Sequence, residues 1–186
     1  MAVPAIITVA LMTSNAYSQH ARGTESRLLV LLGLVCLALV GGALYFQFAL
    51  GEDPCPWCIM QRYGFIFVAI FTFIAAALPA RSVPRHLVIW LALLSAIGGM
   101  IAAGKHVYIL SSVQSCGFDT LQPIVDSLPP AKWLPALFKT AGLCDTPYPP
   151  ILGLSLPAWA LLGFFIAFCS LLGVIIAHRR ARARFA

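Results

Sequence analysis

The sequence predicts an all-α fold, a four-helix transmembrane bundle with a short amphipathic helix on the membrane surface. The chain of 186 residues is 61% hydrophobic and only 10% charged, whereas a soluble domain carries about 25% charged residues. Its mean hydropathy is +0.92. It also contains four unbroken apolar runs, and a bilayer accepts helices of about 20 such residues because they satisfy their own backbone. The runs cover residues 28–50, 63–78, 87–103 and 157–177.

These runs divide the chain into three parts. We predict a cytoplasmic N-terminal segment at 1–27, a single four-helix transmembrane domain at 28–178, and a basic cytoplasmic tail at 179–186. The first segment contains a short apolar run that ends in small residues, as in a signal peptide, but no basic residue precedes that run. We therefore interpret it as a loosely held extension or a surface segment.

Basic residues predict how the chain is oriented in the membrane. With four spans, eight arginines fall on one side, and short flanks rich in Lys and Arg face the cytoplasm. We therefore expect both termini in the cytoplasm, and the loops at 51–62 and at about 104–156 on the outer side of the membrane. This pattern accounts for the net charge of +6 without a nucleic-acid partner. The eight are Arg22, Arg27, Arg81, Arg85, Arg179, Arg180, Arg182 and Arg184.

Four of the six cysteines fall in the two outward loops, two in each. The outer side of a bacterial inner membrane is oxidising, so disulfides can persist there. The distribution therefore predicts two pairs with a joint purpose. Cys36 and Cys169 have apolar neighbours within the membrane runs and are interpreted as small hydrophobic residues. A structural zinc site usually has two tight pairs, and this chain has one, so we expect no metal. The four loop cysteines are Cys55, Cys58, Cys116 and Cys144.

The first pair lies in Cys-Pro-Trp-Cys at 55–58, where the second helix is expected to begin. The partial positive charge of a helix N-terminus favours a thiolate at Cys58. Arg62 is four residues further on, so it lies on the same helical face and adds a permanent positive charge. Cys55 is close enough to form a disulfide with Cys58. A structural disulfide would gain nothing from the guanidinium, although a structural pair beside a snorkelling arginine is the alternative.

Arg62 also indicates a ligand that arrives from the lipid. Such a ligand would be apolar and would carry an oxygen that accepts a hydrogen bond, as a quinone does. A fixed cation would stabilise the negative charge that develops on that oxygen. This reasoning does not select a quinone over other lipid-soluble oxidants. His106 follows the third apolar run at the same boundary, where a histidine is more often a passive headgroup contact.

The second pair, Cys116 and Cys144, is separated by 27 residues. Within this stretch, Pro129 and Pro130 can start a short helix with apolar residues on one face and lysines that reach headgroups. We predict an amphipathic helix on the membrane surface, with an ordinary loop that dips towards lipid as the alternative. A long loop that carries a disulfide suits a pair that must meet a water-soluble partner. The apolar residues are Trp133, Leu134, Leu137 and Phe138, and the lysines are Lys132 and Lys139.

These residues resemble the DsbB family of bacterial inner-membrane, quinone-dependent thiol oxidases. The resemblance covers nearly the whole chain after residue 22. It rests on Cys-Pro-Trp-Cys-Ile-Met-Gln-Arg at 55–62, Lys-His at 105–106, Lys-Trp-Leu-Pro at 132–135, Gly-Leu-Ser-Leu-Pro-Ala-Trp at 153–159, and the spacing from Cys116 to Cys144.

The resemblance implies a role for each site residue. Cys55 and Cys58 match the pair next to the quinone, and Cys58 would be the sulfur that engages it. Arg62 would be needed for quinone use, and His106 would lie near the quinone. The cofactor is thus expected to be ubiquinone or menaquinone from the membrane pool.

The resemblance also implies the route of the electrons. Cys116 would form a mixed disulfide with a periplasmic thioredoxin-like oxidase of the DsbA type, and Cys144 would be its partner in the loop. The expected function is therefore that of a membrane thiol oxidase, which reoxidises this partner and passes two electrons to a quinone. A partner with a potential of about −120 mV needs a still stronger acceptor.

Two alternatives remain open from the sequence. Oxidases similar to vitamin K epoxide reductase also combine four helices, a Cys-x-x-Cys pair and a quinone, but their loop cysteines precede that pair, whereas Cys116 and Cys144 follow it. A membrane scaffold with two structural disulfides is the second alternative. It predicts that Arg62 can be replaced without loss of activity and that no quinone binds.

Overall fold

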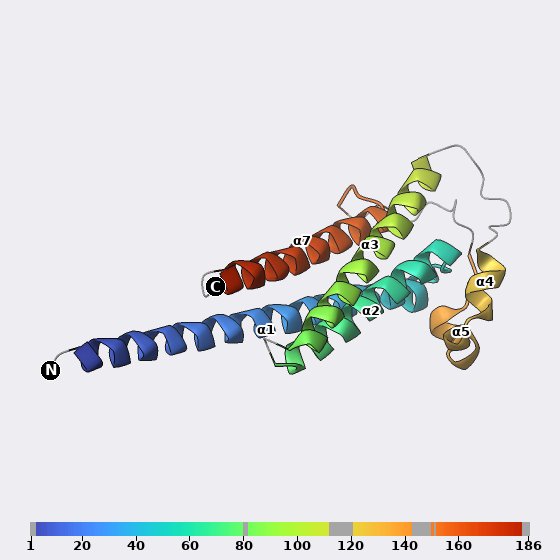
Figure 1. Ribbon diagram of the computed structural model, residues 1–186. Coiled ribbons are helices and arrows are strands. Elements are labelled where there is room, and N and C mark those ends of the chain that lie inside the picture. The colour runs from blue at the N-terminus through green and yellow to red at the C-terminus, as the bar shows by residue number, and fades with distance from the viewer. Residues whose placement is uncertain (1–2, 80–81, 112–120, 143–149, 151, 184–186) are drawn as a thin grey trace.

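Four long helices form the body of the molecule (Figure 1). The computed structural model describes residues 3–79, 82–111, 121–142, 150 and 152–183, without the side chains of 3–22 and 181–183. Every element in these ranges is an α-helix, which confirms the predicted all-α class. The long helices are α1 (Val3–Leu50), α2 (Pro56–Ala77), α3 (Val83–Ser111) and α7 (Leu156–Ala183).

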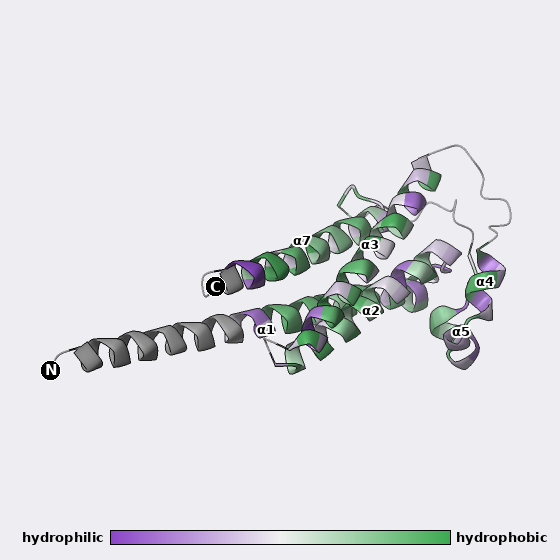
Figure 2. Ribbon diagram, in the orientation of Figure 1, coloured by the Kyte–Doolittle hydropathy of each residue, from purple (hydrophilic) through white to green (hydrophobic). Residues whose placement is uncertain are grey.

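All four long helices contain a stretch that can cross a membrane, so the protein is a multi-pass membrane protein. The stretches are Gly23–Leu50, Pro56–Ala77, Val83–Ser111 and Leu156–Arg180. Their hydropathy, between 1.7 and 2.6, is visible as the apolar colouring of the helices in Figure 2. Large apolar side chains such as Leu31 and Leu94 are 59% exposed on the outside of the bundle, where lipid replaces water as the solvent.

The helix boundaries differ from the sequence prediction at three places, one of which is the end of α7 at Ala183, inside the predicted tail at 179–186. The first helix was expected from residue 28, whereas α1 begins at Val3 and runs through the predicted boundary. The third was expected to end near residue 103, whereas α3 continues to Ser111, because apolar residues resume after Lys105. The correction matters for His106, which lies inside α3 rather than just past it.

Proline starts the three later long helices. Pro56, Pro84 and Pro157 each lie in the first turn, where proline is tolerated because the first backbone N–H groups have no helical partner. Pro79 follows the end of α2, since proline cannot continue a helix. Pro56 therefore places the start of α2, and with it the first cysteine pair, shortly after the end of α1.

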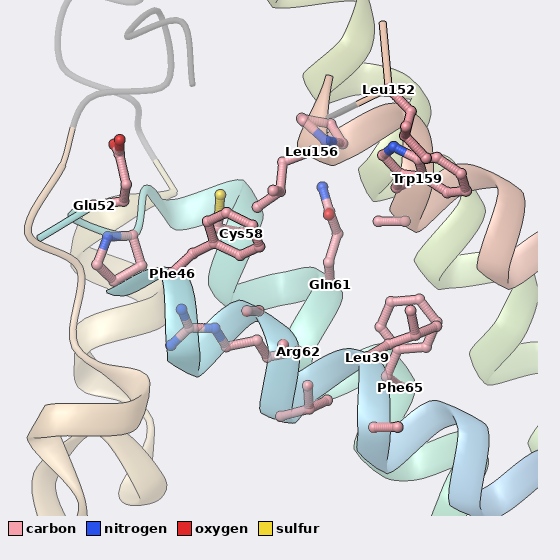
Figure 3. Close-up of a pocket in the computed structure, with 17 residues that line it drawn as sticks. Leu39, Phe46, Glu52, Cys58, Gln61, Arg62, Phe65, Leu152, Leu156 and Trp159 are labelled. Atoms are coloured by element: carbon pink, nitrogen blue, oxygen red, sulfur yellow. The ribbon is translucent and has the colours of Figure 1, made fainter. Parts of the chain in front are cut away.

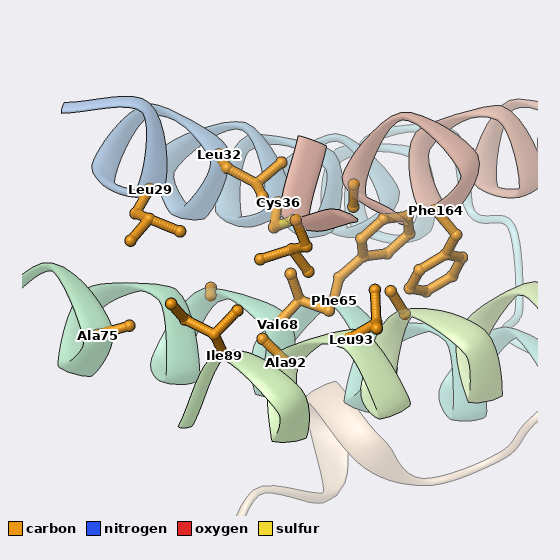
Figure 4. Close-up of a cluster of buried hydrophobic side chains, with 14 of the residues drawn as sticks. Leu29, Leu32, Cys36, Phe65, Val68, Ala75, Ile89, Ala92, Leu93 and Phe164 are labelled. Carbon is orange, nitrogen blue, oxygen red and sulfur yellow. The ribbon is translucent and has the colours of Figure 1, made fainter. Parts of the chain in front are cut away.

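The core lies between α1, α2, α3 and α7 (Figure 4). Phe164 is fully buried, and its ring stacks on that of Phe65 with centroids 3.8 Å apart. The stack fits because α3 presents no side chain there, and a Cβ placed on Gly99 would lie 2.2 Å from Phe164. Small residues at helix contacts are the usual means by which membrane helices approach closely.

The loop between α3 and α7 contains three short helices in its described part, α4 (Gln122–Ser127), α5 (Pro129–Trp133) and α6 (Pro135–Phe138). The predicted surface helix is therefore present as two pieces, α5 and α6. Pro135 divides them because it lacks an N–H and disfavours helical geometry at the preceding residue, and Leu134 has φ −132° and ψ 65°. Trp133 is 80% exposed, and its contact with the membrane surface stays a prediction.

Candidate functional site

The first cysteine pair is built into the start of α2. Cys55 is the residue before the helix, and its Sγ accepts a hydrogen bond from the backbone N–H of Cys58 at 3.4 Å. The two Sγ atoms lie 3.2 Å apart in a hydrogen bond, which is the dithiol form of the pair. Cys55 is fully buried and Cys58 is half-buried, so Cys58 is the sulfur that a ligand can reach.

His106 of α3 packs directly against both sulfurs. Its Nε2 lies 3.7 Å from Cys55 Sγ and its Nδ1 lies 3.9 Å from Cys58 Sγ. The side-chain nitrogen of Gln61 lies 3.3 Å from the same Nδ1, and His106 is fully buried. The residue-based interpretation of a passive headgroup contact is therefore wrong. A neutral imidazole at this position can accept a proton from a thiol.

The same three residues form a group of soft ligands. The sulfurs of Cys55 and Cys58 and a ring nitrogen of His106 all lie within 4.8 Å of one another. These are atoms that zinc uses, but a closed structural site takes four protein ligands, and the described residues supply three here. The arrangement is accounted for as a dithiol beside an imidazole.

Arg62 lies one helical turn beyond Cys58 and is only 5% exposed. Its Nη1 donates to Oε1 of Gln47 and to the carbonyl oxygen of Leu137, both at 2.8 Å. Gln47 in turn donates to the carbonyl of Ala136 at 2.8 Å. The guanidinium therefore connects α2 with α1 and with the surface helix α6. Gln47 is not among the site residues predicted from the sequence, although a polar residue within an apolar span is itself a signal of function.

Cys58 and Arg62 both line one cavity of about 400 Å³ (Figure 3). Gln61 is a third polar group on its wall, and most of the other lining residues are apolar. The structure thus brings the reactive sulfur and the fixed charge onto one ligand-sized space. His106 contacts the sulfurs but does not line this cavity. The apolar walls include Leu39, Phe46, Phe65, Leu156 and Trp159.

The end of the second loop is bound to the residues that precede Cys55. The backbone N–H groups of Ala141 and Gly142 donate to the carbonyl of Pro54 at 3.0 and 3.1 Å. The approach requires glycine, since a Cβ at Gly142 would lie 2.3 Å from the carbonyl oxygen of Asp53. This contact brings the second loop to the first cysteine pair.

Two predicted site residues cannot be placed. Cys116 and Cys144 fall at 112–120 and 143–149, outside the described residues, so their pairing stays a prediction. The neighbouring part of the loop is held by Asp126, whose carboxylate accepts hydrogen bonds from the backbone and hydroxyl of Thr140 at 2.9 to 3.0 Å. Cys144 follows Gly142 by two positions in the sequence.

Comparisons with known proteins agree on one family. The family described as disulfide bond formation protein DsbB matches residues 25–176. A Pseudomonas putida protein named disulfide bond formation protein B 1 is 62% identical over 145 residues, which cover 76% of this chain and 84% of the relative. A Burkholderia thailandensis protein named disulfide bond formation protein B is 53% identical over 156 residues, with 83% and 92% covered.

Proposed function

Because the chain belongs to the DsbB family of disulfide bond formation proteins, we propose that it is a quinone-dependent thiol oxidase that regenerates a periplasmic DsbA-type protein. Family membership and the four apolar helices already make it a membrane protein of disulfide formation with disulfide oxidoreductase activity. The quinone and the DsbA-type partner are the proposal. One observation carries it, namely that Cys58 and Arg62 line the same apolar cavity.

The cavity fits a flat apolar ring that carries hydrogen-bond acceptors. Its walls are mostly apolar, and its polar side chains besides Cys58 are those of Glu52, Gln61 and Arg62. A bound quinone would supply a two-electron acceptor at this place. Cys58 would present its sulfur, Arg62 would hold positive charge where a ring oxygen becomes more negative, and Phe65 and Trp159 would exclude water.

Thiol exchange accounts for the route from the partner to this pair. A thiolate of the reduced partner attacks the disulfide of Cys116 and Cys144, and the partner leaves oxidised while both loop sulfurs become thiols. The loop thiols then reduce a disulfide between Cys55 and Cys58, which yields the dithiol form described above. His106 can accept a thiol proton and thereby favour the attacking thiolate.

The backbone contact between the two loops supports a direct exchange between the pairs. Gly142 is bound to the carbonyl of Pro54, which immediately precedes Cys55, and Cys144 comes two residues after Gly142. A transient disulfide between Cys55 and Cys144 is the step that this arrangement favours. The positive-inside rule supports the periplasmic side for both loops and the cytoplasm for both termini.

Quinone reduction by purified variants tests the proposal. The full chain is mixed with a reduced DsbA-type protein and short-chain ubiquinone, and quinone absorbance is followed, with menaquinone as a second acceptor. We expect Cys58→Ser to abolish quinone loss and Arg62→Ala to slow it about a hundredfold, the usual effect of removing one preorganised electrostatic partner. Cys169→Ser and Arg180→Ala change exposed residues outside the cavity and serve as matched controls.

The alternatives give different results in this assay. If no quinone type is consumed with any partner, and thiol trapping finds both pairs permanently oxidised, the protein is a scaffold with structural disulfides. If quinone is consumed but Arg62→Ala reacts at the natural rate, the cavity is not where the electrons leave. The order of the cysteine pairs in the sequence already argues against an oxidase similar to vitamin K epoxide reductase.

A further inference from the structure

A second cavity, of about 200 Å³, lies at the other end of the bundle. It is formed by the first part of α3 and the last part of α7, and these ends lie opposite the start of α2 (Figure 1). Four of its eight lining residues are basic, and none is acidic. The basic residues are Arg85, His86, His178 and Arg179, and the apolar residues are Ile89, Trp90, Val174 and Ile175.

Helix packing explains part of this cluster. Arg85 is only 1% exposed, and its Nη2 lies 3.5 Å from Oε2 of Glu25 on α1. The same carboxylate oxygen lies 3.6 Å from Nδ1 of His178 on α7. One Glu25 carboxylate is therefore shared by two basic groups from two other helices. It ties α1, α3 and α7 together at this end of the bundle.

The same contacts leave positive charge at the cavity. Glu25 does not line it, and Arg179 has no ion pair among the residues that the structure describes. The Nε of Arg85 is buried and has no hydrogen-bond partner among the described residues. His86 and His178 also line the cavity, and their ring centroids lie 4.6 Å apart. Nδ1 of His86 lies 2.9 Å from the carbonyl oxygen of Ser82, and Nδ1 of His178 faces Glu25, so only Nε2 of each ring is left for a ligand. An anion would match these groups.

The apolar half of the cavity indicates what carries the anion. Ile89, Val174 and Ile175 would gain nothing from a fully hydrated ion, whereas they can contact a glycerol or acyl chain. Trp90 is 44% exposed, and tryptophan concentrates at membrane boundaries because its ring is apolar and its N–H is polar. Basic pockets between membrane helices are established positions for acidic headgroups.

We infer that this cavity binds the phosphodiester headgroup of an anionic phospholipid. Arg179 donates to the phosphate oxygens, and Arg85 supplies charge from the buried side. The two histidines donate through Nε2 when their rings are protonated. The lipid chain lies along the apolar wall formed by α3 and α7. The site is distant from the cysteine pairs, so the inference does not depend on the proposed oxidase activity.

Lipid titration of the full chain tests this site. The purified protein in neutral detergent is titrated with short-chain phosphatidylglycerol, short-chain phosphatidylcholine or inorganic phosphate, and bound molecules are counted by native mass spectrometry. We expect one phosphatidylglycerol to bind more tightly than phosphatidylcholine, and inorganic phosphate not to displace it. Arg179→Gln should weaken phosphatidylglycerol binding about fivefold, the effect of one basic residue near an anionic headgroup.

Arg180→Gln is the matched control, because Arg180 is the adjacent exposed arginine and does not line the cavity. It should bind phosphatidylglycerol as the natural chain does, and a second cavity variant, His178→Gln, should reproduce the loss. Equal effects of Arg179→Gln and Arg180→Gln would overturn the site, because binding would then follow only the total charge of the tail. Displacement by equimolar inorganic phosphate would overturn the lipid as occupant and leave a soluble phosphate in its place.

Discussion

Replacing Gly142 by alanine should separate the second loop from the first cysteine pair. A Cβ at this position would lie 2.3 Å from the carbonyl oxygen of Asp53 and 3.0 Å from its carbon. Both sides of the contact are backbone, so the two segments must move apart by about 1 Å to reach ordinary contact. The bonds from Ala141 and Gly142 to Pro54, now 3.0 and 3.1 Å, would then exceed hydrogen-bonding distance.

The free-energy change follows from these two bonds. Each contributes about 0.5–1.5 kcal/mol, so the anchored conformation loses about 1–3 kcal/mol relative to the detached one. That is a decrease of about fivefold to 150-fold in the equilibrium constant for anchoring. The hydrogen bonds between Asp126 and Thr140 do not involve Gly142, so the rest of the loop should keep its structure.

Two reductants distinguish this effect from general damage. With a reduced DsbA-type partner, Gly142→Ala should reduce quinone turnover at least about fivefold, because exchange between the two cysteine pairs in the proposed function needs the anchored loop. With a small dithiol that reduces Cys55 and Cys58 directly, turnover should match that of the natural chain. Gly41→Ala is the control, since a Cβ at Gly41 meets nothing within 4 Å. Unchanged partner-driven turnover in Gly142→Ala would refute the reasoning.

Two further substitutions test the packing of the helices at Phe164 and the orientation of the Arg62 guanidinium. Gly99→Ala should destabilise the bundle by about 1–3 kcal/mol, because the added methyl group overpacks against Phe164. Gly98→Ala is the control and should not destabilise it, since a Cβ at Gly98 meets nothing within 4 Å. Thermal unfolding in detergent compares the two variants, and equal melting temperatures would contradict the packing. Gln47→Leu removes an acceptor of Arg62, worth about 1.5–3 kcal/mol to a charged donor, and should slow quinone reduction. Gln47→Glu keeps the acceptor but places a negative charge beside the guanidinium, so it should slow quinone reduction as well. A natural rate in both variants would show that Gln47 does not orient the charge.

Local sequence was sufficient for the cysteine pair and its arginine. Cys55, Cys58 and Arg62 lie within two helical turns of one helix, so spacing alone determines which side chains share a face. The four spans were equally predictable, because the cost of an unpaired backbone in lipid forces apolar runs to be helical. Both predictions depend only on residues that are close together in the chain.

The contacts between helices were not predictable in this way. His106 reaches the sulfurs from α3, 48 residues after Cys58, and its position depends on how α2 and α3 pack. Its sequence neighbourhood resembles the end of an apolar run, which led to the interpretation as a headgroup contact. The spacing of the apolar residues predicts one continuous surface helix, whereas Pro135 disfavours helical geometry at Leu134 and divides the helix into two pieces.

The hydrogen bonds of Arg62 connect the charge at the cavity to the loop that carries the second cysteine pair. Its Nη1 is shared between Gln47 of α1 and the carbonyl of Leu137, and Leu137 lies between Cys116 and Cys144 in the sequence. Both acceptors are neutral, so they orient the guanidinium without cancelling its charge. Any movement of α6 therefore changes the support of the charge next to Cys58. A partner that displaces α6 when it engages the loop would act on both ends of the electron route at once.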